Sequence, residues 1–532
     1  EKYQNHHLYR CLKYLTSSFD SSWISSSDLH QNKKSVQLLI KNISCSKCLC
    51  YCILPGPWGV PFLGSLPWLR RGAPHSWFLQ VAAKHGDLTS VRLGANLLVC
   101  IGCPRLLRDL FNRADSIGRP HTPLNNLLGG RGIVLSEGLL WRKQRQFLHE
   151  KFRALGARLC NYEKFQKLIE IEELLTKLEG FREEPVNPSI LLGRHVHNII
   201  CQLTISFRFQ ENDPDFKTFN ERVTKGMKLY GDIHIGEHIP AYLYLPGKKA
   251  VLKEIDRNLR DISEFHLKQV AQRREQLMHG NLEDHTPADL LDYYLLEMQK
   301  KSFGKSKLFK GVDPDEQIVQ VFNDLFSAGM ETSRTTLLWT LVMMLREPIV
   351  EARVRADLKQ AVEPGQLVTL DHRPKLPYIE AVIFETLRIV SVVPLGTTHV
   401  NTTQWNVGGY VIPAGTHLVP LLNKINMDPD LYPEPNNFVP ERFLRDSNLY
   451  FPDTFMPFGV GRRICLGEHL ARIELFLFFS NIMNNFEFHL LEGEVLPGLE
   501  GVVGITHAPL PYKLCFKKLG IDNRSPQKGY GL

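Results

Sequence analysis

Apolar and polar residues alternate along this chain with two spacings, one typical of strands and the other of helices. Short strand-like runs come first, at residues 88–93 and 97–101. From Trp141 to about Leu345, apolar residues recur three and four positions apart, which is the spacing of one helix face. The pattern therefore predicts a mostly α fold with small β-sheets. The clearest helical segments are residues 151–180, 251–279 and 288–299.

The strongest single helix is predicted over residues 313–345. The run DPDE that begins at Asp313 places a proline and acidic side chains in the first turn. Proline fits that position, and the helix dipole favours negative charge there. The remaining predicted elements are helices at 378–390 and 467–485, a strand-like run at 407–412 and a proline-rich loop at 427–457.

The chain predicts one large domain and a separate leading segment. Residues 54–66 hold three prolines and three glycines in an apolar run, with a fourth proline at Pro67, which predicts a rigid non-helical hinge. No linker follows it, so residues 67–519 are expected to form a single catalytic domain with a flexible tail at 520–532. Residues 1–53 are polar and serine-rich, and we expect them to be poorly structured or wrongly joined. Residues 35–54 are the one apolar candidate there, but their lysines make them unsuitable as a membrane span.

Composition excludes few classes of protein. The formal charge is +8, with lysine and arginine spread along the chain, so no nucleic-acid partner is expected. Eleven cysteines in 532 residues do not form a disulfide scaffold, which indicates a reducing, cytosol-facing location. Cys45, Cys48, Cys50 and Cys52 lie close together, but no second pair of ligands follows them as in a structural zinc site. We therefore do not assign a metal to this cluster.

The strongest chemical signal is the run Phe458-Gly-Val-Gly-Arg-Arg-Ile-Cys465-Leu-Gly467. Cys465 follows a glycine-rich turn and two arginines, and it stands at the start of the last predicted helix. A helix amino terminus and nearby cations both favour thiolate over thiol. The glycines let the backbone approach a flat ligand and direct N–H groups at the sulfur, and such bonds tune a haem thiolate. Cys465 is therefore interpreted as a ligand to iron.

Two further motifs lie on predicted helices. Glu385-Thr-Leu-Arg388 puts a carboxylate and a guanidinium on one helix face, where most such pairs are weak surface ion pairs. Ala328-Gly-Met-Glu331-Thr332 contains a mid-helix glycine, which costs about 1 kcal/mol against alanine. One interpretation is a tolerated glycine beside a capping threonine. The other is a local opening of the helix where oxygen binds, with an acid–alcohol pair for proton delivery.

These motifs resemble those of the cytochrome P450 family. The Cys465 run matches the family's haem loop F-x-x-G-x-R-x-C-x-G at every fixed position, and residues 328–332 match its A-G-x-[DE]-T motif. The resemblance covers roughly residues 54–519. It implies the P450 fold, an α-rich single large domain with haem between the long oxygen-side helix and the cysteine loop. It also implies haem b as the cofactor, Cys465 as the axial ligand, and Glu331 and Thr332 as catalytic residues.

The resemblance assigns the other site residues as well. Glu385, Arg388 and Arg442 of the run PERF would form a buried ionic triad with a structural role. Haem contacts are expected from Arg119, Trp141, Arg145, Ala328, Gly329, His399, Phe458, Gly459, Arg463 and Gly467. Substrate contacts are expected from Phe322, Asp324, Phe326 and Leu395. For Asp324, a buried structural hydrogen bond is the alternative role.

The implied reaction inserts one oxygen atom from O2 into a C–H bond of a lipophilic substrate. Because no G-x-G-x-x-G follows a strand, the chain offers no flavin or nicotinamide site of its own. Electrons from NADPH are thus expected through NADPH–cytochrome P450 reductase, with cytochrome b5 as a further candidate partner. The hinge at 54–66 resembles the microsomal type, which implies membrane association on the cytosolic face of the endoplasmic reticulum.

Three runs bear on the substrate: DLFSAGMETSRTTLLW, VPLGTTHV and FMPFGVGRRICLGEHLARIELFLFF. They look like the insect microsomal group that hydroxylates the ecdysteroid side chain at the 25 or 26 position. We expect such a steroid hydroxylase, with a xenobiotic-metabolising monooxygenase as the alternative. A haem-thiolate isomerase or a non-catalytic haem-binding protein fits less well, because the Glu331-Thr332 pair and the thiolate loop are both intact.

Overall fold

A computed structural model describes residues 54–69, 74–155, 170–211, 213–278, 286–302 and 308–520. The predictions for residues 1–53, the cysteine cluster among them, and for the tail beyond residue 520 lie outside these ranges. The chain divides into two units. The larger comprises Leu54–Trp405 and Ile412–Leu532, and the described part of the smaller is Asn406–Val411.

A hairpin occupies the described part of the smaller unit. Strands β4 (Trp405–Val407) and β5 (Tyr410–Ile412) pair with each other. Gly408 and Gly409 join them with φ angles of +58° and +82°, which glycine adopts without strain. Strand structure therefore occurs where the sequence predicted it, around 407–412, as two short strands that the glycine pair joins.

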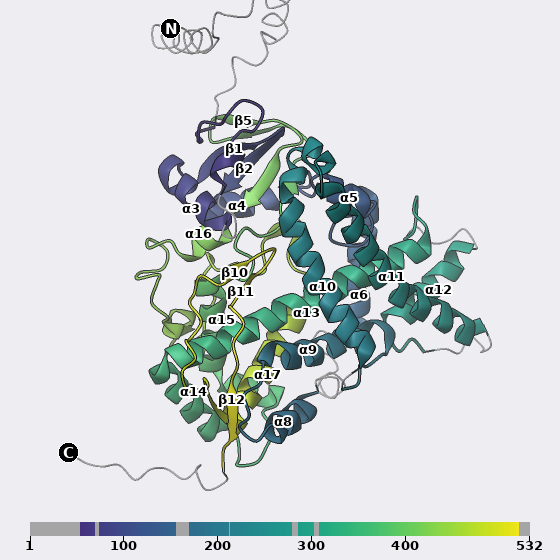
Figure 1. The fold of residues 1–532 in the computed structure, drawn as a ribbon. Coiled ribbons are helices and arrows are strands. Elements are labelled where there is room, and N and C mark those ends of the chain that lie inside the picture. Colours follow the sequence, from purple (N-terminus) through teal and green to yellow (C-terminus); the bar gives the residue numbers. More distant parts are fainter. Residues whose placement is uncertain are drawn as a thin grey trace, which may run out of the picture. The chain divides into compact units, whose positions relative to one another are not determined.

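The larger unit is mainly helical, as predicted, and Figure 1 shows the long helix α13 (Pro314–Arg346) crossing its middle. The side chain of Asp313 accepts a hydrogen bond of 3.0 Å from the backbone N–H of Glu316, which caps the start of α13. The other α-helices are α3 (Pro74–His85), α4 (Pro104–Phe111), α5 (Pro123–Leu127), α6 (Gly138–Ala154), α8 (Ile171–Gly180), α9 (Pro188–Ile205), α10 (Pro214–Ile233), α11 (Lys248–Met278), α12 (Leu290–Ser302), α14 (Pro348–Ala361), α15 (Pro377–Val390), α16 (Leu422–Asn426) and α17 (Glu468–Asn485). Short 3-10 helices occur at η1 (Leu66–Trp68), η2 (His234–Glu237), η3 (Pro240–Tyr244), η5 (Leu370–Lys375), η6 (Pro440–Phe443) and η7 (Gly461–Arg463).

The helical segment predicted at 151–180 differs from what the structure shows. Helix α6 ends at Ala154 and Leu155 already lies beyond it, whereas α8 begins at Ile171. Residues 156–169 between them are outside the described ranges. The other predicted helices appear within a few residues of their expected ends, and the α-rich fold class is confirmed.

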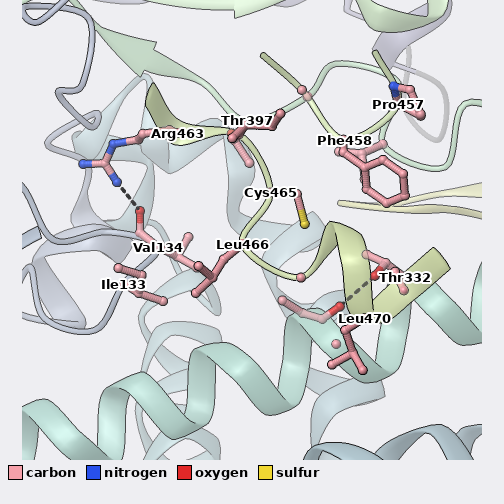
Figure 2. Close-up of a pocket in the computed structure, with 18 of the residues that line it drawn as sticks. Ile133, Val134, Thr332, Thr397, Pro457, Phe458, Arg463, Cys465, Leu466 and Leu470 are labelled. Atoms are coloured by element: carbon pink, nitrogen blue, oxygen red, sulfur yellow. Dashed lines mark hydrogen bonds between the residues drawn. The ribbon is translucent and has the colours of Figure 1, made fainter. Parts of the chain in front are cut away.

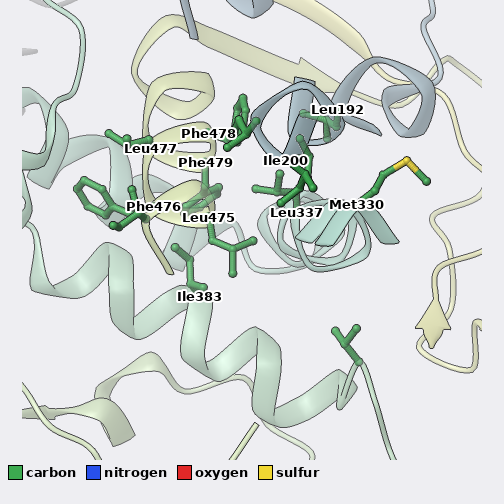
Figure 3. Close-up of a cluster of buried hydrophobic side chains, with 14 of the residues drawn as sticks. Leu192, Ile200, Met330, Leu337, Ile383, Leu475, Phe476, Leu477, Phe478 and Phe479 are labelled. Carbon is green, nitrogen blue, oxygen red and sulfur yellow. The ribbon is translucent and has the colours of Figure 1, made fainter. Parts of the chain in front are cut away.

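The core of the larger unit forms where α13 meets α9, α15 and α17. Figure 3 shows Leu337 and Met330 of α13 among side chains from these helices, with Phe476 and Phe479 contributed by α17. Gly329 explains how closely α13 and α9 approach. A Cβ atom at this position would lie 2.9 Å from Cδ1 of Ile200 on α9. The mid-helix glycine is therefore a packing requirement, and α13 continues as an α-helix through it without the predicted opening.

Small sheets hold segments that are far apart in sequence. The largest has the order β1 (Leu88–Leu93), β2 (Asn96–Ile101), β6 (His417–Pro420), β3 (His399–Val400). Strands β2 and β6 run parallel, and Leu98 lies opposite His417. Two backbone hydrogen bonds of 2.8 and 3.1 Å join Gly118 to Val400, which places Arg119 beside β3. The remaining pairs are β7 (Leu444–Arg445) with β8 (Asn448–Leu449), β9 (Phe486–His489) with β12 (Cys515–Lys518), and β10 (Val502–Val503) with β11 (His507–Ala508).

Within the described ranges, no helix combines the length and the apolar character that crossing a membrane requires.

Candidate active site

A cavity of about 350 Å³ lies between the Cys465 loop and helix α13. Figure 2 shows the sulfur of Cys465 facing its interior, with Thr332 and Leu470 on one side and Arg463 and Val134 on the other. Residues from sequence motifs that are far apart along the chain line this one cavity. Of the expected haem contacts, those that line the cavity are Arg119, Trp141, Arg145, Ala328, Gly329, His399, Phe458, Gly459, Arg463 and Gly467.

The loop that carries Cys465 is fixed by its glycines and by a neighbouring arginine. Gly461 has a φ of +82°, and a Cβ atom on it would lie 2.2 Å from the carbonyl oxygen of Phe111, so this position requires glycine. The Nε–H of Arg462 donates to the carbonyl of Asn112 at 3.0 Å. The backbone N–H of Cys465 donates to the carbonyl of Phe458 at 3.0 Å. These contacts hold the thiol in place from both sides.

Opposing influences act on the pKa of the Cys465 thiol. Its sulfur is open to the cavity but otherwise enclosed by protein, and this burial raises the pKa above its ordinary value. Backbone hydrogen bonds from Gly467 and Glu468 and the positive charge of Arg145 act to lower it, whereas the carboxylate of Glu468 raises it. Burial is the largest effect, so a thiolate at this position needs a further positive partner such as a metal ion.

Three guanidinium groups form one wall of the cavity. Burial and mutual repulsion lower the pKa of Arg119 to about 10 and that of Arg463 to about 8, and burial lowers the pKa of Arg145. Arg463 donates to the carbonyls of Ile117 at 2.8 Å and of Ser136 at 2.6 Å. In the described ranges, no carboxylate forms an ion pair with any of these three arginines. The carboxylate of Glu137 raises the pKa of Arg119 and Arg463, but one carboxylate does not balance three guanidinium groups, so this wall fits a ligand that brings further anionic groups.

Trp141 and His399 complete this wall. The guanidinium of Arg463 lies 4.3 Å from the ring centroid of Trp141 in a cation–π contact. His399 stacks on Phe111 with ring centroids 4.1 Å apart. Burial, together with repulsion from Arg119 and Arg463, keeps the pKa of His399 well below its ordinary value. The imidazole is thus neutral, and its Nδ1 has no hydrogen-bond partner among the described atoms.

Helix α13 forms the opposite wall through one stripe of side chains. With 3.6 residues per turn, positions four apart share a face, and the cavity is lined at 324, 328 and 332 together with the adjacent residues 325, 329 and 333. The Oγ1 of Thr332 donates to the carbonyl of Ala328 at 2.9 Å. This hydroxyl is the part of the predicted acid–alcohol pair that faces the cavity.

Glu331 does not line the cavity. Its carboxylate forms an ion pair with Arg334, and it accepts hydrogen bonds from Thr506 at 3.1 Å and from Thr335 at 3.3 Å. Residue 331 precedes the cavity-lining stripe by one position, so its side chain projects toward the segment that holds Thr506. The structure therefore does not bring Glu331 and Thr332 together as a pair inside the cavity.

Three of the four expected substrate contacts lie elsewhere. Phe322 and Phe326 are fully buried in the core, where Phe326 packs against His266 with ring centroids 4.4 Å apart. Both rings pack against His266 of α11, and neither side chain lines the cavity. Leu395 packs in a separate cluster with the side chains of α3 and β2. None of these three side chains lines the cavity, so the structure does not place them as substrate contacts.

Asp324 lines the cavity and has the structural hydrogen bonds that were its alternative role. Its Oδ2 accepts hydrogen bonds from the backbone N–H groups of Ile133 at 2.7 Å and Val134 at 2.9 Å, and Gln320 donates to Oδ1 at 2.9 Å. Burial raises the pKa of this carboxyl to about 6, against the opposing effect of these bonds. Asp324 thereby ties the loop that forms a cavity wall to helix α13.

Glu385, Arg388 and Arg442 meet in the structure. Arg388 binds Glu385 through two contacts of 2.7 Å, and both side chains are fully buried. The Nε of Arg442 lies 3.3 Å from Oε1 of Glu385. Arg388 also donates to the carbonyl of Asn426 at 2.8 Å. This network joins α15 to the segment before the Cys465 loop and does not reach the cavity.

Sequence reasoning missed two polar residues of the cavity, Ser333 and Glu474. The Oγ of Ser333 donates to Oε2 of Glu474 at 2.9 Å, across the contact between α13 and α17. A signal was available in the sequence, because Glu474 is the one charged position in the apolar run IELFLFF. Its partner on α13 could not be identified without the packing of the two helices.

The α-rich fold and a cysteine-centred cavity walled by arginines define a haem-binding oxidoreductase. The sequence model described as cytochrome P450 matches residues 54–516, and the chain belongs to this family. Cytochrome P450 18a1 of Drosophila melanogaster is 40% identical over 471 residues, which are 87% of this chain and 86% of the relative. Cytochrome P450 2U1 of Rattus norvegicus is 32% identical, covering 88% and 91% of the two chains. Cytochrome P450 2B19 of Mus musculus is 33% identical, covering 87% and 93%.

The protein is thus a monooxygenase that uses haem b, O2 and electrons that NADPH supplies through a reductase. The cavity fits this cofactor, since it offers one thiol toward the iron and a wall of three cations toward two carboxylates. When bound, the haem supplies the redox chemistry that activates O2. The chain's own residues hold it, exclude water and place the substrate.

Proposed function

We propose that this monooxygenase hydroxylates the side chain of an ecdysteroid, with Cys465 as the axial ligand of the haem iron. One observation carries the substrate class, namely that apolar side chains make up much of the cavity lining. A lipophilic molecule is the ligand that such a wall binds by removing apolar surface from water. The side chains that form it are Phe111, Ile133, Leu325, Val392, Val393, Pro420 and Leu422.

The choice of an ecdysteroid as substrate rests on sequence similarity to relatives. The relative from Drosophila melanogaster is 40% identical over most of both chains, compared with 30–33% for the mammalian relatives. The cavity residues Ala328, Thr332 and Cys465 lie within the runs that resemble the insect ecdysteroid group. This agreement supports an insect hormone substrate over other lipophilic molecules.

The proposed roles follow the geometry. Cys465 binds the iron as thiolate, and Arg119, Arg145, Arg463, Trp141 and His399 hold the haem carboxylates. Ala328 and Gly329 add little bulk to the cavity wall, and the hydroxyl of Thr332, which here donates to the carbonyl of Ala328, would turn toward the cavity to present its proton. Glu385, Arg388 and Arg442 fix the fold behind the loop.

A xenobiotic substrate is the second candidate. The apolar wall offers few free polar groups to orient a steroid hydroxyl, because Asp324 is occupied by the backbone of Ile133 and Val134. A site of this kind accepts molecules of varied shape. The same experiment distinguishes the two candidates.

We also propose the cytosolic face of the endoplasmic reticulum membrane as the location, with NADPH–cytochrome P450 reductase as the electron donor and cytochrome b5 as a second one. The support is the microsomal type of hinge at residues 54–66 and the likeness to relatives of the P450 2 group.

The test is turnover of the haem-loaded enzyme with a reductase and NADPH. Ecdysteroids with and without a free 25 or 26 position are offered beside generic lipophilic probes, and products are identified by mass spectrometry. We expect one added oxygen on the side chain of the ecdysteroids. A Cys465→Ser protein, which loses the thiolate, should form no product and no red-shifted CO band.

Turnover of the probes alone would overturn the ecdysteroid assignment in favour of the second candidate. Full side-chain hydroxylation by Cys465→Ser would overturn the ligand assignment. Product formation without NADPH would contradict the electron route.

A further inference from the structure

His507 is a buried histidine that contacts the end of helix α15. It lies on strand β11 with 6% of its surface exposed. Its Nδ1 lies 2.7 Å from the carbonyl oxygen of Val390, the last residue of α15, and its Nε2 lies 3.1 Å from the carbonyl oxygen of Glu500. Both ring nitrogens therefore face an oxygen atom that can only accept a hydrogen bond.

The two contacts indicate which protonation state the ring has. A neutral imidazole carries one N–H and donates to one carbonyl, whereas its other nitrogen would present a lone pair to the second oxygen. An imidazolium carries an N–H on each nitrogen and donates to both carbonyls. The carboxyl end of a helix also favours a positive charge, and Val390 ends α15. The geometry thus fits the cationic form of His507.

The surroundings hold the ring in this orientation. A Cβ atom on Gly501 would lie 2.8 Å from Nε2 of His507, so this position requires glycine. The rings of Trp339 on α13 and His75 on α3 lie 5.2 and 5.8 Å away, measured between ring centroids. Burial and repulsion by His507 lower the pKa of His75, so His507 is the charged ring of the two histidines.

The charged side chains of the helices packed near β11 have partners of their own. They form two ion pairs, Glu331 with Arg334 on α13 and Glu385 with Arg388 on α15. Thr506, the neighbour of His507, donates to Oε1 of Glu331 at 3.1 Å. The side chain of Glu500 is exposed, and His507 contacts its backbone carbonyl. The positive charge on His507 is therefore held mainly by backbone carbonyls.

The residues that His507 contacts lead directly into the cavity wall. Its backbone N–H donates to the carbonyl of Val392 at 2.8 Å, so its ring and its backbone together bind Val390 and Val392. Val392 and Val393 line the cavity. The carbonyl of His507 accepts a hydrogen bond of 2.8 Å from Nε1 of Trp339 on α13, which forms another wall of the same cavity. His507 thus joins two walls of the cavity without lining it.

We propose that His507 is a positioning residue of the monooxygenase, and that its cationic form holds the wall at Val392 and Val393 in the shape that binds an apolar substrate. When the ring loses a proton it releases one of its two carbonyls, and the remaining bonds alone hold the wall. Substrate affinity then falls as the pH rises, whereas the rate of the bound complex changes less. His507 would act in this way on any apolar substrate, so the ecdysteroid assignment does not bear on it.

Nitrogen NMR measures the protonation state of the ring. The haem-loaded protein is labelled with 15N-histidine, reduced, saturated with carbon monoxide and recorded between pH 6 and pH 9. The loss of signals in His507→Gln identifies those of His507. We expect two similar N–H nitrogens at pH 6 and one nitrogen without a proton at pH 9. A ring with one bare nitrogen already at pH 6, or with both protons still at pH 9, would overturn the proposal.

Ligand affinity measures the shape of the wall. Two triazoles are titrated into the haem-loaded protein, and the shift of the haem absorption band gives their Kd. Tebuconazole has a bulky apolar tail that can reach the wall, whereas methyltriazole lacks the tail. From pH 6 to pH 9 we expect the Kd of tebuconazole to rise about twofold to tenfold, the equivalent of one net hydrogen bond, and that of methyltriazole to stay constant.

Two variants separate His507 from the other titratable groups of the cavity. His507→Gln offers an uncharged donor at every pH, and His507→Phe keeps a ring without donors. Asp324 and Glu474 also line the cavity, and their titration remains in both variants, so the difference from the wild-type profile reports His507. His489→Gln is the matched control and should keep the wild-type profile, because His489 is exposed at the end of β9.

Parallel pH profiles of tebuconazole affinity in the wild type and His507→Gln would overturn the proposal. If His507→Phe does not retain haem, His507→Gln gives the decision. In turnover with reductase and NADPH, KM should rise with pH more steeply in the wild type than in His507→Gln, while kcat changes alike in both. A wild type that consumes no NADPH with any substrate would contradict the monooxygenase activity, whereas the NMR and tebuconazole results would still decide the role of His507.

Discussion

Arg119, Arg145 and Arg463 repel one another across one wall of the cavity, and backbone carbonyls are their principal hydrogen-bond partners there. At the scale of single residues, these three guanidinium groups concentrate positive charge where an anionic ligand would bind. Burial and the neighbouring cations Arg119 and Arg145 lower the pKa of Arg463 to about 8, because they make its charged form less favourable. Two haem carboxylates would remove the repulsion, so each arginine contributes to retention of the cofactor.

We predict that Arg119→Gln loses haem about tenfold to a hundredfold faster than the wild type. Charge-assisted hydrogen bonds contribute roughly 1.5–3 kcal/mol, which corresponds to that range. Transfer of haem from the purified enzyme to excess apomyoglobin measures the rate. Arg153→Gln is the control, because Arg153 is exposed at the end of α6 and does not line the cavity. Equal rates in all three proteins would show that the arginine wall does not hold the cofactor.

Asp324 permits a second prediction, which concerns the cavity wall. Asp324→Ala leaves the buried N–H groups of Ile133 and Val134 without an acceptor, at roughly 1–3 kcal/mol for each. We expect a lower free energy of unfolding and faster hydrogen exchange at these two amides. Asp324→Asn keeps one oxygen acceptor and should retain most of the stability.

The pH dependence of Asp324 has a definite sign. Its pKa is raised from 3.8 to about 6, so its contribution to stability is complete below 3.8 and is lost as the pH rises through 6. Asp324→Asn should therefore gain stability relative to the wild type between pH 5 and pH 7. A constant difference across this range, in denaturant titrations, would count against a raised pKa.

At the scale of elements, the contact between α13 and α9 shows how one missing side chain sets the distance between two helices. Gly329 has no Cβ, and Ile200 of α9 occupies the space that a Cβ would need. Ile200 also lines the cavity, so a substitution that displaces Ile200 would change the shape of the cavity. The glycine thus serves both packing and cavity shape.

We predict that Gly329→Val lowers the free energy of unfolding by about 1–3 kcal/mol, the usual cost of overpacking a core. Ile200→Ala in the same chain should return part of this loss, because it removes the atoms that collide. A double-mutant cycle by denaturant unfolding measures the coupling. Additive effects would show that the two residues do not compete for space.

Elements with a strong local signal could be predicted from sequence, and those made by tertiary pairing could not. Helix α13 was predictable because Asp313 and its acidic first turn mark its start. The parallel pairing of β2 with β6 joins residues about 320 positions apart, and nothing local encodes it. The strand-like segments around 407–412 were also predictable, and Gly408 and Gly409 form the turn that joins them.

The same division holds for the site. Cys465, Thr332 and the arginines stand in contiguous motifs, so spacing alone indicated them. Phe322 and Phe326 were misplaced because both rings pack against His266 of α11, and that helix contact is not encoded locally in the sequence. Glu331 points away from the cavity and Glu474, which the sequence did not indicate, lines it, since the direction of a carboxyl and the identity of its partner depend on packing between helices.

At the scale of the whole molecule, buried histidines set the response to acid. Burial lowers the pKa of His197 to about 3 and of His266 to about 4, and both rings pack against Phe326. The neutral forms of both rings stabilise the folded protein. This contribution is complete above about pH 6.5 and is lost as the pH falls toward the two pKa values. Glu474 acts in the opposite sense, since its contribution is lost as the pH rises from 4.5 through 8.

We predict a stability maximum near neutral pH, with an acid limb that His197→Leu makes less steep. The measurement is the free energy of unfolding in denaturant from pH 4.5 to pH 8. His489→Leu is the control, because His489 is an exposed residue at the end of β9. An acid limb of the same slope in His197→Leu and the wild type would contradict a buried neutral imidazole.

The hydrogen bonds of the cysteine loop also constrain biosynthesis. Arg462 and Arg463 bind carbonyls of Asn112 and Ile117, which precede them by 350 and 346 residues. While the ribosome extends the chain, Arg119 and Arg145 are made early, whereas Arg463 and Cys465 emerge more than 300 residues later. Haem can therefore be captured only after translation has passed Cys465, and a nascent chain must keep its unfinished pocket from aggregating until then.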